Sequence, residues 1–353
     1  MQIQTNQWMD NTLQWLLEMD PHNPGVRYFA LRDLLQRSED DREVSNARRE
    51  IMETGPVPAI LQSQHPDGYW AKPGGGHSPS YKVTVWQIIF LAELGADPND
   101  ERVQRGCEYL LSHNIAANNG FSMTPRPIPS SVVHCLNGDP LFALMRLGYA
   151  GDERIQNALE WLVQAITGEG DIRFYKSGTS GKSFACAYNL KQSCAWGAVK
   201  ALKALSAVTP GSRTLAMDRA IEAGISFLLD CELAEADYPY TERIGSAWFS
   251  FGFPLSFRSD ILETSLVLAD LGCGEDPRLV NAHQFILNKR GAEGRWIMES
   301  SLNGKMWVDI EAKGQPSKWI TLRALQALGI KRPDLSPAKL YSAKSNKTNY
   351  EMI

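Results

Sequence analysis

The sequence predicts an all-α protein, an α/α toroid of about five to six helical hairpins. Three observations support this fold class. One pattern of two helices joined by a turn recurs along the 353 residues, which is typical of repeat architectures. Strand-like alternation and hairpin signals are weak throughout. The chain also closes with an apolar half-repeat at 319–329, which can pair with the first repeat, whereas an open solenoid needs polar end repeats.

The clearest copies of the repeat span 85–114, 139–166 and 259–290. Each begins with an apolar helix, and a glycine after that helix predicts a left-handed stop. These stop glycines are Gly95, Gly148 and Gly272. A looser copy spans 194–233, and a further copy begins upstream at Val26. We expect one helix of each pair to line the centre of a ring and the other to form its rim.

The turn inside each clear copy carries an aspartate and an arginine two residues apart. These pairs are Asp100 with Arg102, Asp152 with Arg154, and Asp276 with Arg278. An amphipathic second helix follows each turn. Asp40 and Asp41 fill the same turn of the first copy, so we interpret them as solvated turn residues. The repeats predict a single toroid domain over 1–330, and the Lys-, Ser-, Asn- and Pro-rich stretch 331–353 reads as a polar tail.

Composition and charge exclude several classes of protein. The chain is 43% hydrophobic with a formal net charge of −4, which is incompatible with a disordered chain. It has no Lys/Arg-rich block to follow a phosphate backbone, so we expect no nucleic-acid partner. No apolar run reaches about 18 residues, so we expect no transmembrane segment. The N-terminus lacks a cationic start and a long apolar core, and the six cysteines are not closely spaced, which predicts a cytoplasmic protein with reduced thiols.

Aromatic residues are abundant and many lie beside glycine in the predicted loops. The chain has 10 Trp, 11 Tyr and 12 Phe. Two loops share a glycine followed two residues later by tryptophan: Gly68 with Trp70, and Gly294 with Trp296. Such a glycine permits a turn, and the ring can then pack against the start of the next helix. We therefore expect these aromatics to clamp one hairpin to the next.

Several of these stretches resemble a known group of proteins. They are Trp15-Leu16-Leu17 with Val26-Arg27-Tyr28, Phe251-Gly252-Phe253-Pro254, and Ser317-Lys318-Trp319 with Thr321-Leu322-Arg323. Through them, and through the repeat from about 15 to 329, the chain resembles the prenyltransferase/squalene-cyclase repeat superfamily, most closely its short single-toroid bacterial members. The resemblance implies a terpenoid cyclase-like α/α toroid. Departures limit what it implies about activity, because the chain lacks the Asp-x-Asp-Asp acid motif, the Asp-Asp-x-x-Asp Mg²⁺ motif and an Asp-x-Cys zinc site in register.

The starts of the predicted inner helices carry most of the unusual polar residues. We expect inner helices to converge, so that side chains at their starts project into a shared cavity. Asp260 and Glu263 lie on one face of a helix, which suits general acid chemistry if that face is buried. The alternative is a helix cap, in which Asp260 closes the N-terminus and Glu263 completes a capping box. His134 and Cys135, at another junction, are a second candidate catalytic pair.

Three cysteines from consecutive junctions form a candidate metal site. Cys135, Cys186 and Cys194 could converge in a ring, with His134 or His77 as a fourth zinc ligand. The spacing between Cys186 and Cys194 is longer than in familiar zinc clips, and buried free cysteines explain the same residues. Zinc is the only cofactor that the sequence suggests. A thiol acting as nucleophile or acid with His134 is a further alternative.

Aromatic and basic residues are candidates for the substrate-binding wall of the cavity. They are His77, Tyr81, Trp86, Trp196, Trp248, Phe253, Trp319 and Arg323. Aromatic faces stabilise positive charge and bind apolar ligands. For each residue, ordinary packing between hairpins is the competing interpretation.

Together these features favour a terpene-cyclase/prenyltransferase-like enzyme. Its expected chemistry is acid–base cyclisation, isomerisation or dehydration of an apolar, isoprenoid-derived substrate, as in an isomerase or lyase. One alternative is a zinc-dependent enzyme that uses the cysteine trio. The other is a non-enzymatic toroid that binds a lipid or a peptide.

Overall fold

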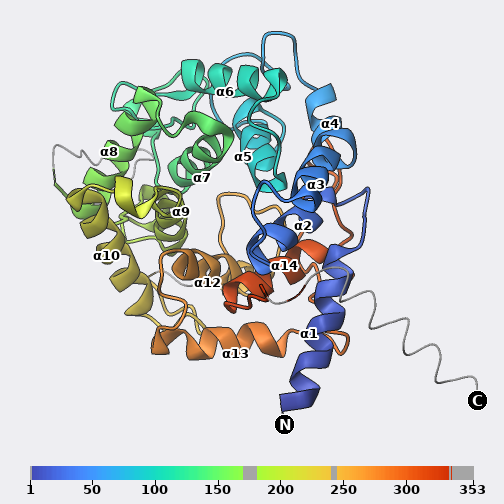
Figure 1. The fold of residues 1–353 in the computed structure, drawn as a ribbon. Helices are drawn as coiled ribbons and strands as arrows, with labels where there is room; N and C mark the ends of the chain where they lie inside the picture. Colours follow the sequence, from blue (N-terminus) through green and yellow to red (C-terminus); the bar gives the residue numbers. More distant parts are fainter. Residues whose placement is uncertain (1, 170–180, 240–244, 334, 336–353) are drawn as a thin grey trace, which may run out of the picture.

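The computed structural model describes residues 2–169, 181–239, 245–333 and 335. Within these ranges the chain is helical and forms the predicted α/α toroid (Figure 1). An inner ring of helices surrounds the centre: α2 (Pro24–Phe29) continued by η1 (Ala30–Leu34), α5 (Thr84–Leu94), α7 (Cys135–Leu144) continued by η3 (Met145–Tyr149), α9 (Ala195–Ser206), α12 (Ile261–Asp270) and α14 (Lys318–Ala327).

An outer layer of helices packs around this ring. It consists of α1 (Gln2–Leu17), α3 (Arg42–Glu53), α6 (Glu101–Asn114), α8 (Glu153–Thr167), α10 (Leu215–Leu229) and α13 (Val280–Asn288). Two shorter helices, α4 (Pro56–Gln62) and α11 (Gly245–Trp248), lie in the connecting segments, as do the 3₁₀ turns Pro129–Ser131, Ala187–Asn189, Pro210–Ser212 and Pro277–Leu279.

The ring closes between the last helix and the first. Along the chain, α5 packs on α7, α7 on α9, α9 on α12 and α12 on α14, and α14 then packs on α2 and α1. The N-terminal helix α1 thus supplies the outer partner of the final half-repeat. At the remaining junction, Gly25 of α2 approaches α5 so closely that a Cβ there would lie 2.6 Å from the carbonyl oxygen of Leu94. The prediction of a closed toroid is confirmed.

Local sequence signals produce the helix ends as expected. Gly95, Gly148 and Gly272 are left-handed, with φ of 85°, 94° and 87°. The aspartate of each Asp-x-Arg turn is an N-cap: Asp100 and Asp152 cap the outer helices α6 and α8, and Asp276 caps the 3₁₀ turn that leads into α13. Their carboxylates accept from the backbone N–H two residues later at 2.8, 2.8 and 2.9 Å. The arginine of each turn also pairs with that same carboxylate, so the motif is a capping device.

The two glycine–tryptophan loops are built alike. The indole N–H of Trp70 donates to Ile60 and that of Trp296 donates to Ile286, at 2.8 and 2.7 Å. Each tryptophan also donates its backbone N–H to a threonine hydroxyl at the start of an inner helix, Thr84 or Thr321. The loop aromatics therefore clamp neighbouring hairpins as expected. No helix in the described ranges is long and apolar enough to cross a membrane.

The start of the predicted polar tail contacts the toroid. The backbone N–H of Arg332 donates to the carbonyl oxygen of Leu34 at 2.7 Å, and its guanidinium pairs with Asp10 at 2.9 Å. Residues 334 and 336–353, most of the expected tail, lie outside the described residues.

Candidate functional site

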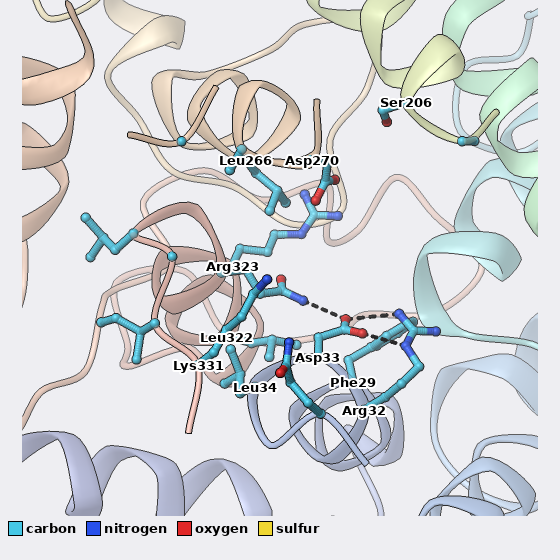
Figure 2. A pocket seen from close by; sticks show the side chains of 18 of the residues that line it. Phe29, Arg32, Asp33, Leu34, Ser206, Leu266, Asp270, Leu322, Arg323 and Lys331 are labelled. Carbon is cyan, nitrogen blue, oxygen red and sulfur yellow. Dashed lines mark hydrogen bonds and ion pairs between the residues drawn. The ribbon is translucent and has the colours of Figure 1, made fainter. Parts of the chain in front are cut away.

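A cavity of about 1270 Å³ lies at the carboxyl ends of the inner helices. Each inner helix contributes to its wall, and the short turns after them, including Gly272 and Glu275, border it (Figure 2). The apolar part of the wall includes Phe29, Phe142, Leu266, Trp319 and Leu322. The long loops of the repeat lie at the opposite, amino-terminal end of these helices, so the cavity occupies the short-turn end of the toroid.

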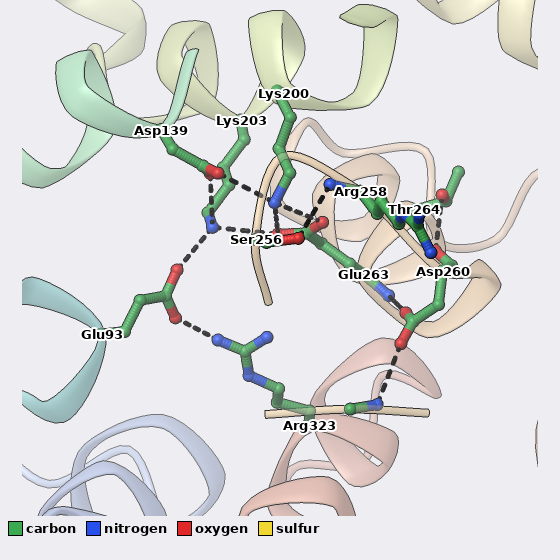
Figure 3. A network of polar contacts seen from close by, with 11 residues as sticks. Glu93, Asp139, Lys200, Lys203, Ser256, Arg258, Asp260, Glu263, Thr264 and Arg323 are labelled. Atoms are coloured by element: carbon green, nitrogen blue, oxygen red, sulfur yellow. Dashed lines mark hydrogen bonds and ion pairs between the residues drawn. The ribbon is translucent and has the colours of Figure 1, made fainter. Parts of the chain in front are cut away.

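Six charged side chains from five inner helices meet beneath this cavity, five of them buried and Glu93 nearly so (Figure 3). They are Glu93 of α5, Asp139 of α7, Lys200 and Lys203 of α9, Glu263 of α12 and Arg323 of α14. Glu93 and Arg323 also line the cavity. We call these six residues the central charge network.

The pairing within the central charge network is dense. Lys200 Nζ lies 2.9 Å from Glu263 and 3.0 Å from Asp139. Lys203 Nζ lies 2.5 Å from Glu93, 2.9 Å from Glu263 and 3.1 Å from Asp139. Arg323 pairs with the second oxygen of Glu93. Three carboxylates thus face three cations, which satisfies the condition that buried charges be paired.

These contacts fix the protonation of most of the central charge network. Burial alone raises the pKa of Glu263, but Lys200 and Lys203 outweigh it and hold that pKa below its ordinary value. Burial also raises the pKa of Glu93, but Arg323 and Lys203 outweigh it and lower that pKa to about 2. Burial lowers and the three carboxylates raise the pKa of Lys203, with a net rise. Near neutral pH, Glu93 and Glu263 therefore stay ionised and Lys203 keeps its proton, so none of the three acts as a proton donor.

Asp260 is the N-cap of α12. Its Oδ1 accepts from the backbone N–H of Glu263 at 2.7 Å, and its Oδ2 accepts from that of Gly252 at 3.3 Å. Burial, with the nearby charge of Glu263, raises its pKa to about 7. The side chain of Glu263 points to the lysines instead of back to the cap. Neither residue borders the cavity: Asp260 is sealed at the amino end of α12, and Glu263 belongs to the central charge network.

His134 and Cys186 are buried away from the cavity, and Cys135 and Cys194 are partly buried there. A ring nitrogen of His134, Nε2, lies 3.0 Å from the carbonyl oxygen of Gly181, and burial lowers the pKa of this imidazole to about 4. Burial raises the pKa of Cys135, with Cys194 and Cys186 contributing, and it raises that of Cys194 to about 11. The thiols are therefore protonated and poorly nucleophilic at neutral pH.

The expected zinc site does not form from these cysteines. Cys135, Cys186 and Cys194 influence one another electrostatically, so they lie in one region. Across the part of the chain that the structure describes, however, no three His, Cys, Asp or Glu side chains are placed to hold a metal ion. Ring geometry brings the junctions together without placing the three described thiols to share a metal ion.

Most of the aromatic residues predicted for the cavity wall instead fill the amino-terminal end of the toroid. The ring of Trp86 packs 5.5 Å from His77 and 5.1 Å from Tyr81, and its indole N–H donates to the carbonyl oxygen of His77. Trp196 packs against Phe257 at the amino end of α9.

The remaining predicted wall residues differ in where they lie. Trp248 is buried and donates its indole N–H to the carbonyl oxygen of Leu233. Phe253 is stacked on Trp319 with ring centroids 4.2 Å apart. Of the eight predicted wall residues, Trp319 and Arg323 line the described cavity.

Most polar residues of the cavity wall were absent from the sequence predictions, among them Asp270 and Arg146. Asp270 ends α12 and Arg146 lies in the last turn after α7, and both border the cavity. Asp270 is exposed to the cavity, yet desolvation by the protein around it raises its pKa to about 6, with Asp33 contributing and Arg146, Lys203 and Lys331 opposing. The sequence carried a signal for them, because each stands two residues before a stop glycine, as does Glu93.

Comparisons with known proteins identify similar solved structures. No family model and no curated protein matches the chain. It is similar to the apo structure of the type II terpene cyclase MstE from Scytonema, with 13% identity, a TM-score of 0.43, and coverage of 91% of this chain and 87% of that one. A variant of that cyclase in complex with geranylgeranyl dihydroxybenzoate matches at 14% identity and a TM-score of 0.43, covering 93% and 88%. A protein from Actinoplanes matches at 15% and 0.41, covering 92% and 98%.

Proposed function

We propose that this chain is an enzyme that carries out acid–base chemistry on an apolar, isoprenoid-type substrate in the cavity, with Asp270 as the proton donor. One observation carries the proposal: a carboxyl group with its pKa raised to about 6 stands in the wall of a cavity of about 1270 Å³. The rings of Phe29, Phe142 and Trp319 belong to the same wall.

Each part of the wall has a use in this chemistry. An acid whose pKa is near the working pH combines a large protonated fraction with a useful driving force for proton transfer. Protonated Asp270 would give its proton to an alkene carbon or a hydroxyl oxygen of the substrate. Aromatic faces stabilise the positive charge that results. The carboxylate would then take a proton back from a neighbouring carbon, so that the step is neutral overall for cyclisation or isomerisation and releases water for dehydration.

The size of the cavity supports a long substrate. Ligand sites are commonly about 300–1000 Å³, and this cavity is at the upper end or beyond. The terpene cyclase named above was solved with a geranylgeranyl compound bound, which makes prenyl alcohols and prenylated aromatic acids a reasonable first panel.

The test is turnover by Asp270→Asn. Purified protein is incubated with this panel and the products are analysed by mass spectrometry. We expect the variant to lose about 10²-fold or more of its turnover, because the amide cannot donate the proton. Turnover by the wild type should fall as pH rises above about 6, since Asp270 then loses its proton. Asp218→Asn, an exposed position on the outer helix α10, is the matched control and should retain full turnover.

Equal turnover by Asp270→Asn and wild type would show that Asp270 is not the proton donor. Tight binding of panel members without any product would favour the non-enzymatic lipid-binding toroid.

A further inference from the structure

We infer that the substrate of this cavity carries a carboxylate, and that Arg146 binds it. The inference deepens the proposed function and rests on it, because it assigns the polar end of the same substrate. The observation behind it is that the cations lining the cavity differ in whether a carboxylate pairs with them.

The arginines that line the cavity differ in their partners. Arg32 is held by both oxygens of Asp33, at 2.5 and 3.0 Å, and Arg323 is paired with Glu93. Arg146 makes no ion pair with any described carboxylate. Its guanidinium is instead held between two rings, 5.8 Å from the centroid of Phe29 and 5.7 Å from that of Phe142.

A helix-capping role does not account for Arg146. Basic side chains near a helix C-terminus can donate to the last carbonyl groups. Arg146 makes no such hydrogen bond within the described ranges. Arg146 is exposed to the cavity, and desolvation by the protein around it together with Arg32 lowers the pKa of its guanidinium, against the opposing charges of Asp33 and Glu93.

The available charge indicates which anion would bind. Lys331 also lines the cavity and has no ion pair among the residues described. One guanidinium and one ammonium suit a carboxylate of charge −1, which a guanidinium can bind through two parallel hydrogen bonds. A diphosphate carries about three negative charges, and the described wall provides neither further unpaired cations nor a carboxylate cluster for a metal ion. Phe29 and Phe142 would contact the substrate chain next to its carboxylate.

The experiment compares three ligands with one chain length. Farnesoate, farnesol and farnesyl diphosphate are titrated into wild-type protein by isothermal calorimetry below their aggregation concentrations. We expect farnesoate to bind at least about tenfold more tightly than farnesol, because hydrogen bonds to charged groups are among the stronger ones. We expect farnesyl diphosphate to bind more weakly than farnesoate.

Variants then assign the preference to Arg146. Arg146→Gln should bind farnesol as the wild type does and lose the preference for farnesoate. Arg146→Lys should keep a reduced preference, because an ammonium cannot form the paired hydrogen bonds. Arg219→Gln, an exposed position on α10, should keep the full preference. If Arg146→Gln does not fold, the lysine variant and the wild-type ligand series still decide the outcome.

Three results would overturn the inference: equal binding of farnesol and farnesoate, tighter binding of the diphosphate, or an undiminished preference in Arg146→Gln. Failure of this inference can be distinguished from failure of the proposed function. A farnesoate preference that depends on Arg146, together with full turnover by Asp270→Asn, leaves the carboxylate subsite in place and removes the proposed acid. The opposite pair of results keeps the acid and removes the subsite.

Discussion

At the scale of single residues, the centre of this toroid holds charged groups of two kinds. The central charge network is fully paired, as buried ions need to be, because removing one partner from a buried pair costs about 3–5 kcal/mol. Asp270 and Arg146, two positions before stop glycines, border open space and have no ion pair among the described residues. This difference separates groups that hold the ring together from groups that are available to a substrate.

Asp260 provides a test of the electrostatics at this scale. Its pKa is about 7 in the folded protein and near 3.8 ordinarily, so the folded state keeps a proton that the unfolded chain has released. Stability therefore falls as pH rises between these two values. Asp260 alone should lower the free energy of unfolding by about 2 kcal/mol between pH 5 and pH 8. Asp260→Asn should remove that part of the fall, measured by urea denaturation at both pH values.

Two comparisons make the Asp260 result specific. Asp139 and Asp270 also have raised pKa values and remain in the variant, so the fall should shrink and not vanish. Asp276→Asn alters a partly buried N-cap on the outer layer whose pKa is lowered, and should leave the difference between pH 5 and pH 8 as it is in the wild type. An unchanged pH dependence in Asp260→Asn would contradict the assignment.

At the scale of helices, the closest packing joins α7 and α9. A Cβ on Gly138 would lie 2.0 Å from the carbonyl oxygen of Lys200, far inside contact distance. This close approach places Asp139 beside Lys200 and Lys203, so the helix spacing and the central charge network depend on one glycine.

Gly138→Ala should therefore separate the two helices. We expect a loss of about 2–3 kcal/mol or more in the free energy of unfolding, because overpacking displaces both backbones. Gly151→Ala is the control, since a Cβ there meets nothing within 4 Å, and it should change stability by no more than about 0.5 kcal/mol. If urea denaturation gave the two variants equal free energies of unfolding, α7 and α9 could move apart without loss of stability, which would contradict this prediction.

Sequence reasoning succeeded where the signal is local to one element. Stop glycines and Asp-x-Arg turns act through their own backbone, so they mark helix ends in any surroundings. The prediction that side chains at the inner-helix starts line a cavity depended on which end of the ring the loops fill. Trp86 and Trp196 sit at those starts, yet the long loops pack over them, and the open space is left at the other ends. That outcome follows from loop packing, which periodicity does not encode.

At the scale of the whole molecule, the closed ring creates the site. Trp319 stacks on Phe253 and donates its indole N–H to Asn23 at 3.1 Å, which joins the last inner helix to the segment before the first. The same ring lines the cavity. Closure could be predicted because the final half-repeat was apolar and unpartnered. The cavity could not, because its wall combines residues from η1 through Lys331 that meet only once the ring has closed.

A crystal structure of the protein with farnesoate bound would show whether the substrate occupies the carboxyl ends of the inner helices. We expect the apolar chain between Phe29, Phe142 and Trp319, with its carboxylate in hydrogen-bond contact with Arg146 and Asp270 beside the chain. Farnesoate bound instead at the amino ends of the helices, next to Trp86 or Trp196, would contradict this expectation.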